Sequence, residues 1–187
     1  MKLRIISGEL KGRYLSVSGN SSFRPTLERT RESVAEILKD RFPGATVADL
    51  CAGSGAFGFE MISRGALKAD FVELDRRRAS EIRRNAENLK VQNRIRVFSD
   101  DVRSFLPSQK QRYDIIFYDP PYDRVDLQEI VPSVLDLLTP EGVLVYERKR
   151  LPGEKKPPRS GEKEFLADAR LFGDTVVEFH SLHDKEK

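Results

Sequence analysis

Hydrophobic and polar positions change their spacing along the chain. Residues 3–17 alternate between apolar and polar side chains, with Gly8 and Gly12 as turn candidates, which predicts a β-hairpin. The next apolar positions recur three and four residues apart after Thr26, so we expect an amphipathic helix that runs to the break at Pro43-Gly44. A hairpin and one helix are therefore predicted before the main body of the chain.

Beyond this break, short apolar runs alternate with helical patterns. The predicted strands cover residues 47–50, 70–74, 95–98, 113–118 and 143–147, and the predicted helices follow Gly53, Asp75 and Asp101 and lie near 127–138. Two late β-favouring runs flank Gly173-Asp174, which indicates an antiparallel hairpin. Strands that alternate with helices predict a doubly wound, mostly parallel α/β sheet. We expect residues 1–42 to form an extension and residues 43–187 a core, which together act as a single domain.

Composition limits the class of protein. The 187 residues are 39% hydrophobic and 34% charged, which is enough apolar surface for one core and argues against wholesale disorder. The single cysteine, Cys51, cannot form an internal disulfide, and the chain opens on alternating charge, so we expect a cytoplasmic protein. No apolar stretch approaches the roughly 18–20 residues that a membrane span requires.

The net charge of +3 is unevenly distributed. Residues 1–31 and residues 148–163 each hold seven basic residues against two acidic ones, so the rest of the chain is acidic. Two basic segments around an acidic body suit a protein that grips a polyanion. Charged runs also serve simply as solvated surface, and charge alone favours that alternative.

A glycine turn follows the first strand of the core. The run Gly53-Ser54-Gly55-Ala56-Phe57-Gly58 fits the G-x-G-x-x-G pattern of nucleotide-binding loops. Its glycines allow a sharp turn and a close approach of the backbone to the ligand, which both NAD and S-adenosylmethionine require. Glu73 ends the next strand and can accept both ribose hydroxyls. Asp49 would repel a pyrophosphate but attract the ammonium of a methionine group, and Asp101 can accept a hydrogen bond from an adenine amine. These acids have alternative roles as a loop tie, helix caps or turn formers.

The strongest signal is Asp119-Pro120-Pro121-Tyr122, at the end of the fourth core strand. The prolines end the strand and fix its carbonyls, so a carboxylate and a rigid carbonyl can accept both N–H bonds of an exocyclic amine. This favours a tetrahedral nitrogen whose lone pair can face a sulfonium methyl group. Tyr122 offers a stacking face for a displaced base. The alternative is a rigid turn with a buried tyrosine.

The Asp119-Pro120-Pro121-Tyr122 turn, together with Asp49-Leu50-Cys51-Ala52-Gly53-Ser54-Gly55, resembles the class I S-adenosylmethionine-dependent amino-methyltransferases. The N-terminal motifs are similar to the RsmD group of that class, and the similarity covers nearly the whole chain. These motifs are Arg4-Ile5-Ile6-Ser7-Gly8, Lys11-Gly12-Arg13, Arg24-Pro25-Thr26 and Arg29-Thr30-Arg31-Glu32. The resemblance implies a seven-stranded Rossmann-like sheet and transfer of a methyl group to the N2 amine of a guanine in 16S ribosomal RNA.

The resemblance also implies a set of site residues and partners. The catalytic residues would be Asp119, Pro120 and Tyr122, and the S-adenosylmethionine contacts Asp49, Ala52, Gly53, Ser54, Gly55, Gly58, Glu73, Asp75 and Asp101. The RNA contacts would be Lys11, Arg13, Arg24, Thr26, Arg29 and Arg31, although Arg29 can instead pair with Glu28 or Glu32. The partner would be 16S rRNA within a small ribosomal subunit or an assembly intermediate, met by a monomer.

Other functions remain as alternatives. The Asp-Pro-Pro-Tyr turn also fits an adenine-N6 methyltransferase of DNA or RNA, but 187 residues leave no room for a separate duplex-reading domain. A non-catalytic RNA-binding assembly factor would not need the amine-binding turn, and an NAD oxidoreductase would need a catalytic base that is missing. His180 and His183 lie in a polar tail without a cysteine cluster, so we expect no metal site.

Overall fold

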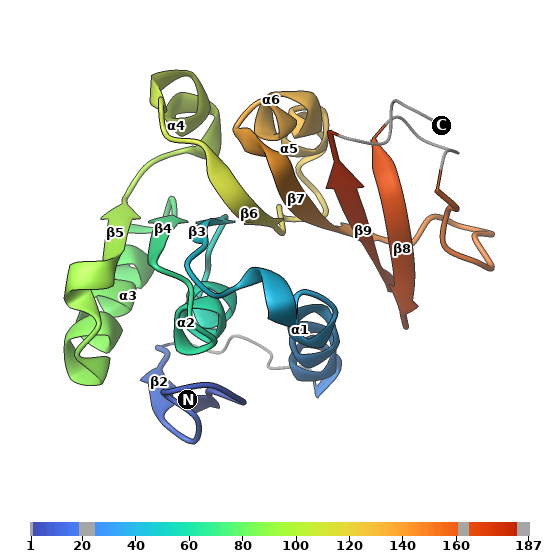
Figure 1. Ribbon diagram of the computed structural model, residues 1–187. Coiled ribbons are helices and arrows are strands. Elements are labelled where there is room, and N and C mark those ends of the chain that lie inside the picture. The colour runs from blue at the N-terminus through green and yellow to red at the C-terminus, as the bar shows by residue number, and fades with distance from the viewer. Residues whose placement is uncertain (1, 19–24, 161–164, 183–187) are drawn as a thin grey trace.

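The computed structural model describes residues 2–18, 25–160 and 165–182 (Figure 1). These residues contain a seven-stranded sheet with the strand order β5-β4-β3-β6-β7-β9-β8. The strands are β3 (Thr46–Leu50), β4 (Lys68–Val72), β5 (Ile95–Phe98), β6 (Tyr113–Tyr118), β7 (Leu138–Lys149), β8 (Leu166–Phe172) and β9 (Thr175–Ser181). Neighbours from β5 to β7 pair in parallel, and β9 is antiparallel to both β7 and β8. The predicted doubly wound sheet with a C-terminal hairpin is confirmed.

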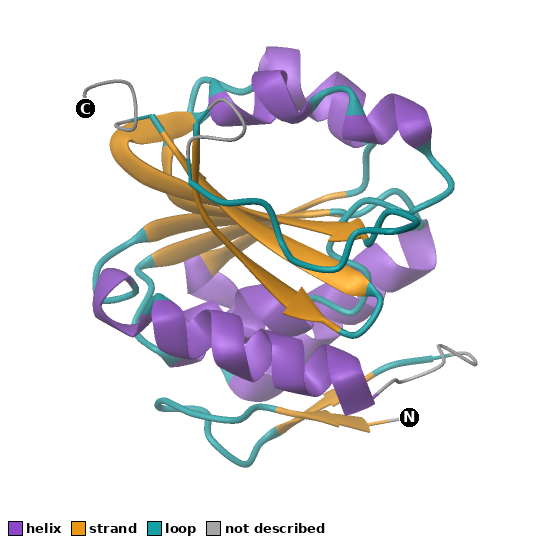
Figure 2. Ribbon diagram, turned by 90° about the vertical axis from the view of Figure 1, so that its right-hand side faces the viewer, coloured by secondary structure: helices purple, strands orange, loops and turns teal. Residues whose placement is uncertain are grey.

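Helices cover both faces of this sheet (Figure 2). One face carries α1 (Pro25–Ile37), α2 (Ala56–Ser63) and α3 (Arg76–Leu89), and the other carries α4 (Val102–Ser108), α5 (Val125–Gln128) and α6 (Val131–Leu135). The single helix expected near 127–138 is thus two short helices, because Pro132 lacks a backbone N–H and is tolerated only in the first turn of a helix, here α6. Two 3₁₀ turns, η1 (Lys39–Arg41) and η2 (Gln92–Arg94), complete the described helices. None of the helices in the described residues is long and apolar enough to cross a membrane.

Alternate residues of the central strands fill two cores. Phe117 and Val145 point toward α1, α2 and α3, whereas Ile116 and Leu144 point toward the helices on the opposite face. The near-continuous apolar sequence of β6 therefore reflects burial on both faces. The same alternation decides which side chains past the strand ends share a face.

The N-terminal hairpin, β1 (Lys2–Arg4) and β2 (Tyr14–Ser16), packs on the outer side of α2 and α3 (Figure 1). Glu60 accepts hydrogen bonds from the amides of Ile6 and Ser7, at 2.9 and 3.1 Å. Asn85 accepts from the Ser16 amide and donates to its carbonyl. Buried polar contacts thus fix the hairpin in one position.

Within the sheet, β3 lies between β4 and β6. The chain builds β4 and β5 on one side of β3 and then returns to add β6 on the other side of β3. In open parallel sheets, ligands bind outside the carboxyl ends of the strands where the order reverses in this way. The segments that follow β3 and β6 are the glycine turn and the Asp-Pro-Pro-Tyr turn. The fold therefore brings the two strongest sequence motifs to one place.

Candidate active site

The glycine turn between β3 and α2 folds through left-handed backbone conformations. Cys51, Gly53 and Gly55 have φ angles of 60°, 57° and 72°, and α2 begins directly afterwards. The Gly53 amide donates a 2.7 Å hydrogen bond to Glu73 Oε2, and Gly55 donates to the Ala52 carbonyl at 2.7 Å. The turn is thereby tied to the end of β4.

A hydrogen bond between Gly58 and Asp49 stabilises the turn on the side away from the pocket. The Gly58 amide donates to Asp49 Oδ2 at 2.8 Å, and a Cβ atom at Gly58 would lie 2.3 Å from the Phe71 ring. Asp49 is only 2% exposed, and this burial, more than the nearby charge of Glu73, raises the pKa of Asp49 to about 8. The structure thus places Asp49 as a support of the turn, behind the pocket that is described next.

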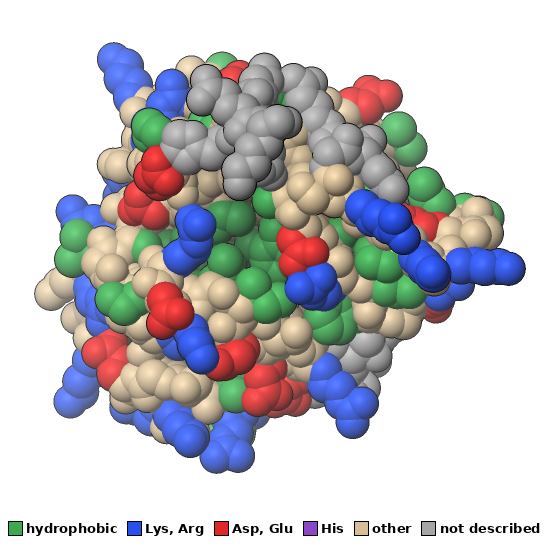
Figure 3. All heavy atoms as spheres, turned by 45° about the vertical axis from the view of Figure 1, so that its right-hand side comes forward, with side chains coloured by type: hydrophobic (Ala, Val, Ile, Leu, Met, Phe, Trp, Pro, Cys, Tyr) green, Lys and Arg blue, Asp and Glu red, His purple; other side chains and the backbone are tan. Residues whose placement is uncertain are grey.

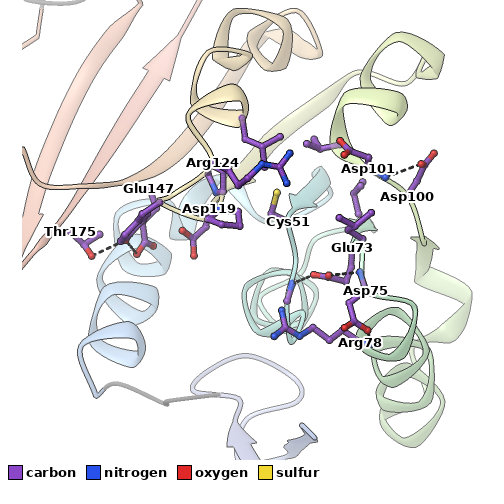
Figure 4. Close-up of a pocket in the computed structure, with 18 of the residues that line it drawn as sticks. Cys51, Glu73, Asp75, Arg78, Asp100, Asp101, Asp119, Arg124, Glu147 and Thr175 are labelled. Atoms are coloured by element: carbon purple, nitrogen blue, oxygen red, sulfur yellow. Dashed lines mark hydrogen bonds between the residues drawn. The ribbon is translucent and has the colours of Figure 1, made fainter. Parts of the chain in front are cut away.

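A pocket of about 980 Å³ opens along the carboxyl ends of the strands (Figure 4). Its lining comes from the loops after β3, β4, β5 and β6, from the end of β7, and from the hairpin turn between β8 and β9. The predicted site residues on its wall are Gly53, Glu73, Asp75, Asp101, Asp119, Pro120 and Tyr122. Asp49, Ala52, Ser54, Gly55 and Gly58 are not part of the lining.

The acids on the β4 and β5 side of the pocket also hold the backbone. Glu73 Oε1 accepts from the Asp75 amide at 2.8 Å, so both Glu73 oxygens contact backbone amides. Asp75 caps α3 by accepting from the amides of Arg77 and Arg78, and these bonds hold the pKa of Asp75 below its usual range. The cap role considered from the sequence is therefore present alongside a position in the pocket.

Asp101 combines a helix cap with an ion pair. It accepts from the Arg103 amide at 2.9 Å, and its Oδ2 lies 2.6 Å from Arg103 Nη2. The hydrogen bond from the Arg103 side chain holds the pKa of Asp101 below its ordinary value. Arg103 also reaches Asp126, so this rim of the pocket is a network of paired charges.

The Asp-Pro-Pro-Tyr turn forms the β6 side of the pocket. Burial, followed by the charges of Glu147 and Asp49, raises the pKa of Asp119 well above its ordinary value. The hydroxyl of Tyr122 donates to Glu147 Oε1 at 3.3 Å and lies 3.0 Å from Thr175 Oγ1. These two contacts, with the partly exposed position of the ring, hold Tyr122 at the mouth of the pocket.

Sequence reasoning missed Glu147 and Thr175. Glu147 is 3% exposed near the end of β7, and desolvation raises its pKa. Figure 4 shows its side chain beside that of Asp119. A signal existed in the repeated aromatic-acid pair, because Tyr118-Asp119 and Tyr146-Glu147 both follow apolar strand residues. The pairing of β6 with β7 is what makes that repetition meaningful.

Cys51 lies on the pocket wall between Asp119 and Glu73 (Figure 4). Burial, with the nearby charges of Glu73 and Asp119, raises the pKa of its thiol to about 12. A thiol that remains protonated at neutral pH is a poor nucleophile. The described residues contain no group of three or more His, Cys, Asp or Glu side chains suited to a metal ion.

The predicted RNA contacts are divided by the fold. Lys11, Arg13 and Arg29 are exposed. Arg31 is 8% exposed and donates to the Arg4 carbonyl at 3.1 Å, so a phosphate contact would require this side chain to move. Arg24 lies outside the described residues, and only the backbone of Thr26 is described, within α1.

The candidates in the N-terminal hairpin lie away from the pocket. Arg13 donates to the carbonyl of Asn88, near the end of α3 that lies opposite the Asp75 cap. The 14 residues of α3 span about 20 Å, which separates the hairpin turn from the pocket. On the face shown in Figure 3, Lys and Arg side chains are spread among Asp and Glu rather than gathered into one patch.

The sequence of this chain is similar to those of known proteins. A family described as conserved hypothetical protein 95 matches residues 3–181. The chain is 36% identical over 135 residues to ribosomal RNA small subunit methyltransferase D of Escherichia coli K12, covering 72% of this chain and 68% of that protein. It is 32% identical to the protein of the same name from Haemophilus influenzae, with 80% of each chain covered.

A solved structure has the same architecture. The Escherichia coli protein yhhF superimposes with a TM-score of 0.82 at 31% identity, over 96% of this chain and 97% of that one. The strand order and the pocket at the switch point define a Rossmann-like methyltransferase that uses S-adenosylmethionine. The chain belongs to the ribosomal RNA small subunit methyltransferase D family.

The residues of the pocket fit this cofactor. Glu73, beside the Gly53 amide, is placed to accept ribose hydroxyls, and the apolar side chains of Val72, Leu74 and Val102 line the adjacent wall where a base would lie. About 980 Å³ is at the upper end of the usual range for small-molecule sites, so the pocket has room for a nucleoside and for a second, incoming base.

Proposed function

We propose that the protein methylates the exocyclic N2 amine of a guanine in 16S ribosomal RNA, within a small subunit or its assembly intermediate. The names of its relatives support a ribosomal RNA substrate. The observation that carries the proposal is the position of Asp119, a partly buried carboxyl just after β6 that lines the same pocket as the glycine turn.

In this proposal Asp119 and the Pro120 carbonyl accept the two N–H bonds of the amine. Accepting both hydrogens turns the nitrogen lone pair away from the base ring and toward the methyl group. S-adenosylmethionine supplies an activated methyl group on a sulfonium sulfur. The nitrogen–carbon bond forms as the sulfur–carbon bond breaks, its electron pair stays on sulfur, and one amine proton leaves to the Asp119 carboxylate.

Tyr122 holds the ring of the target base. Its aromatic face is available at the pocket mouth because Glu147 and Thr175 bind only its hydroxyl. Stacking on an aromatic side chain contributes about 1–3 kcal/mol per base and compensates for removing that base from its neighbours. The side chains of Lys11, Arg13 and Arg29 would contact phosphates.

The test offers labelled S-adenosylmethionine with three substrates: small subunits from cells that lack this methylation, naked 16S rRNA, and duplex DNA. Digestion of the product to nucleosides identifies the methylated base. We expect label in N2-methylguanosine, from subunits or rRNA. Label in N6-methyladenosine or in DNA would refute the guanine assignment.

Asp119→Ala is expected to slow transfer by at least about 100-fold, the usual effect of removing a group that stabilises charge in the transition state. Asp123→Ala, four residues later on an exposed position of the same loop, is the matched control. Transfer that continues at the normal rate in the Asp119 variant would refute its proposed role.

A further inference from the structure

A second carboxylate faces the proposed amine site from the neighbouring strand. In the parallel pairing of β6 and β7, Tyr118 lies opposite Tyr146, so Asp119 and Glu147 are the next residues on the two strands. The two tyrosine rings stack 5.9 Å apart on the side of α5 and α6. The following side chains, Asp119 and Glu147, therefore both turn to the opposite face.

Glu147 is buried, but the described residues satisfy only part of the hydrogen-bonding capacity of its carboxylate. It is 3% exposed and lines the pocket. Among the described residues, its hydrogen-bond partner is the Tyr122 hydroxyl, which reaches Oε1 at 3.3 Å. A buried carboxylate costs free energy unless donors satisfy it, and one hydrogen bond from the described residues leaves Oε2 without a donor. Oε2 of Glu147 is therefore able to accept a hydrogen bond from a ligand in the pocket.

Two adjacent acceptors are complementary to one edge of guanine. The Watson–Crick edge of guanine presents the N1–H donor directly beside the N2 amine. Adenine and 2-aminopurine carry a bare N1 nitrogen instead, whose lone pair would face a carboxylate oxygen. With Asp119 and the Pro120 carbonyl on the amine, the neighbouring acid is placed for the group beside that amine.

We propose that Glu147 accepts the N1–H of the target guanine and thereby determines the choice of base. The inference rests on the proposed function, because it takes the amine held by Asp119 to be the N2 amine. The Tyr122 hydroxyl, bound to the other Glu147 oxygen, links base stacking to base recognition. Glu147 is a specificity-determining residue, and the amine chemistry remains with Asp119.

The test compares two RNAs that differ at one base. The methylated position, once mapped, is presented in small subunits reconstituted from ligated rRNA that carries either guanine or 2-aminopurine there. Both bases have the same amine, but only guanine has N1–H. We expect the wild-type protein to methylate guanine at least about 100-fold faster, because a site built for an N–H group strongly rejects an analogue without it.

Glu147→Gln is the decisive variant. A glutamine amide can accept from N1–H or donate to a bare N1, so the preference for guanine over 2-aminopurine should fall to about tenfold or less. Asp174→Asn, which removes a carboxylate from the exposed rim of the same pocket, should keep the wild-type ratio. A 6-thioguanine substrate keeps N1–H and should be accepted by the wild-type protein.

The outcomes separate the two proposals. Failure of the wild-type protein to methylate the guanine substrate would refute the proposed function itself. Methylation of guanine with an unchanged preference in the Glu147→Gln variant would refute only the role of Glu147. If that variant does not fold, Glu147→Asp is used, since a shortened acid should lower guanine methylation while leaving 2-aminopurine equally poor.

Discussion

The amide of Gly53 donates a 2.7 Å hydrogen bond to the carboxylate of Glu73, 20 residues later. The second oxygen of Glu73 accepts from the Asp75 amide, so one side chain fixes both the glycine turn and the start of α3. Glu73 therefore shapes the pocket in addition to any contact with ribose. Its replacement should affect cofactor binding in two ways at once.

Glu73→Ala should weaken binding of S-adenosylhomocysteine, measured by isothermal titration calorimetry, about 10- to 100-fold. Hydrogen bonds to a charged group contribute about 1.5–3 kcal/mol, which corresponds to this range. Glu73→Gln can satisfy only one of the two amides and should fall between the wild type and the alanine variant. Glu87→Ala, at an exposed position of α3, is the control. Unchanged affinity in the Glu73 variants would contradict this role.

Gly58→Ala should destabilise the protein by about 1–3 kcal/mol, although alanine normally favours a helix. The reason is the Phe71 ring, which would lie 2.3 Å from the new Cβ atom. Unfolding in urea of both single variants and the double variant with Phe71→Leu measures the interaction. We expect the Gly58→Ala substitution to cost less in the Phe71→Leu background; equal costs would exclude the steric cause.

Asp49 should make stability depend on pH. Its pKa rises from 3.8 to about 8 on folding, so between these values the unfolded chain releases a proton that the native protein keeps. Native stability therefore falls as pH rises, by at most about 1.4 kcal/mol per pH unit from this group. Asp49→Asn removes this dependence, so its stability relative to the wild type should increase from pH 5 to pH 8.

Urea unfolding at pH 5, 6.5 and 8 measures that difference. Asp136→Asn removes an exposed carboxylate and serves as the control for loss of charge. A difference between Asp49→Asn and the wild type that stays constant over this range would show that Asp49 is ionised in the native protein.

Arg29→Ala and Lys11→Ala should each weaken RNA binding to a similar extent for different sequences. Removing one ion pair between a basic side chain and an RNA phosphate lowers the slope of log K against log salt by about one unit. Titrations at several salt concentrations measure that slope. Arg84→Ala, at an exposed position of α3, is expected to leave it unchanged. If Lys11→Ala leaves the slope unchanged, Lys11 in the hairpin turn does not contact an RNA phosphate.

Much of the fold followed from the sequence because local patterns determine it. The strands and their helices were visible in the apolar periodicity, and the parallel arrangement then placed Gly53, Glu73, Asp101 and Asp119 at one edge. Parallel strands end on the same side, so the acids that follow β4, β5 and β6 could be placed on the pocket without knowledge of tertiary contacts, whereas Asp49 of β3 lies behind it.

Other features depended on partners distant in the sequence. Glu147 looked like an ordinary strand residue because only its register with β6 brings it beside Asp119. From the sequence, Arg31 was expected to contact RNA, and Arg148 was counted in the basic segment of residues 148–163. In the structure Arg31 donates to the Arg4 carbonyl, and Arg148 lies 2.6 Å from Glu178 and 2.7 Å from Glu154. Charge counting along the chain does not distinguish a solvated guanidinium from one with a buried partner.

Because the N-terminal hairpin is held in one position, α3 keeps a constant distance between the hairpin and the pocket. If Arg13 and the pocket bind the same RNA, the two contacts are held about 20 Å apart at opposite ends of that helix. A flexible strand could adopt this separation only at an entropic cost, whereas a folded RNA can present it ready made. The protein would then select its substrate by measuring a distance within a rigid RNA, without reading the sequence between the two points.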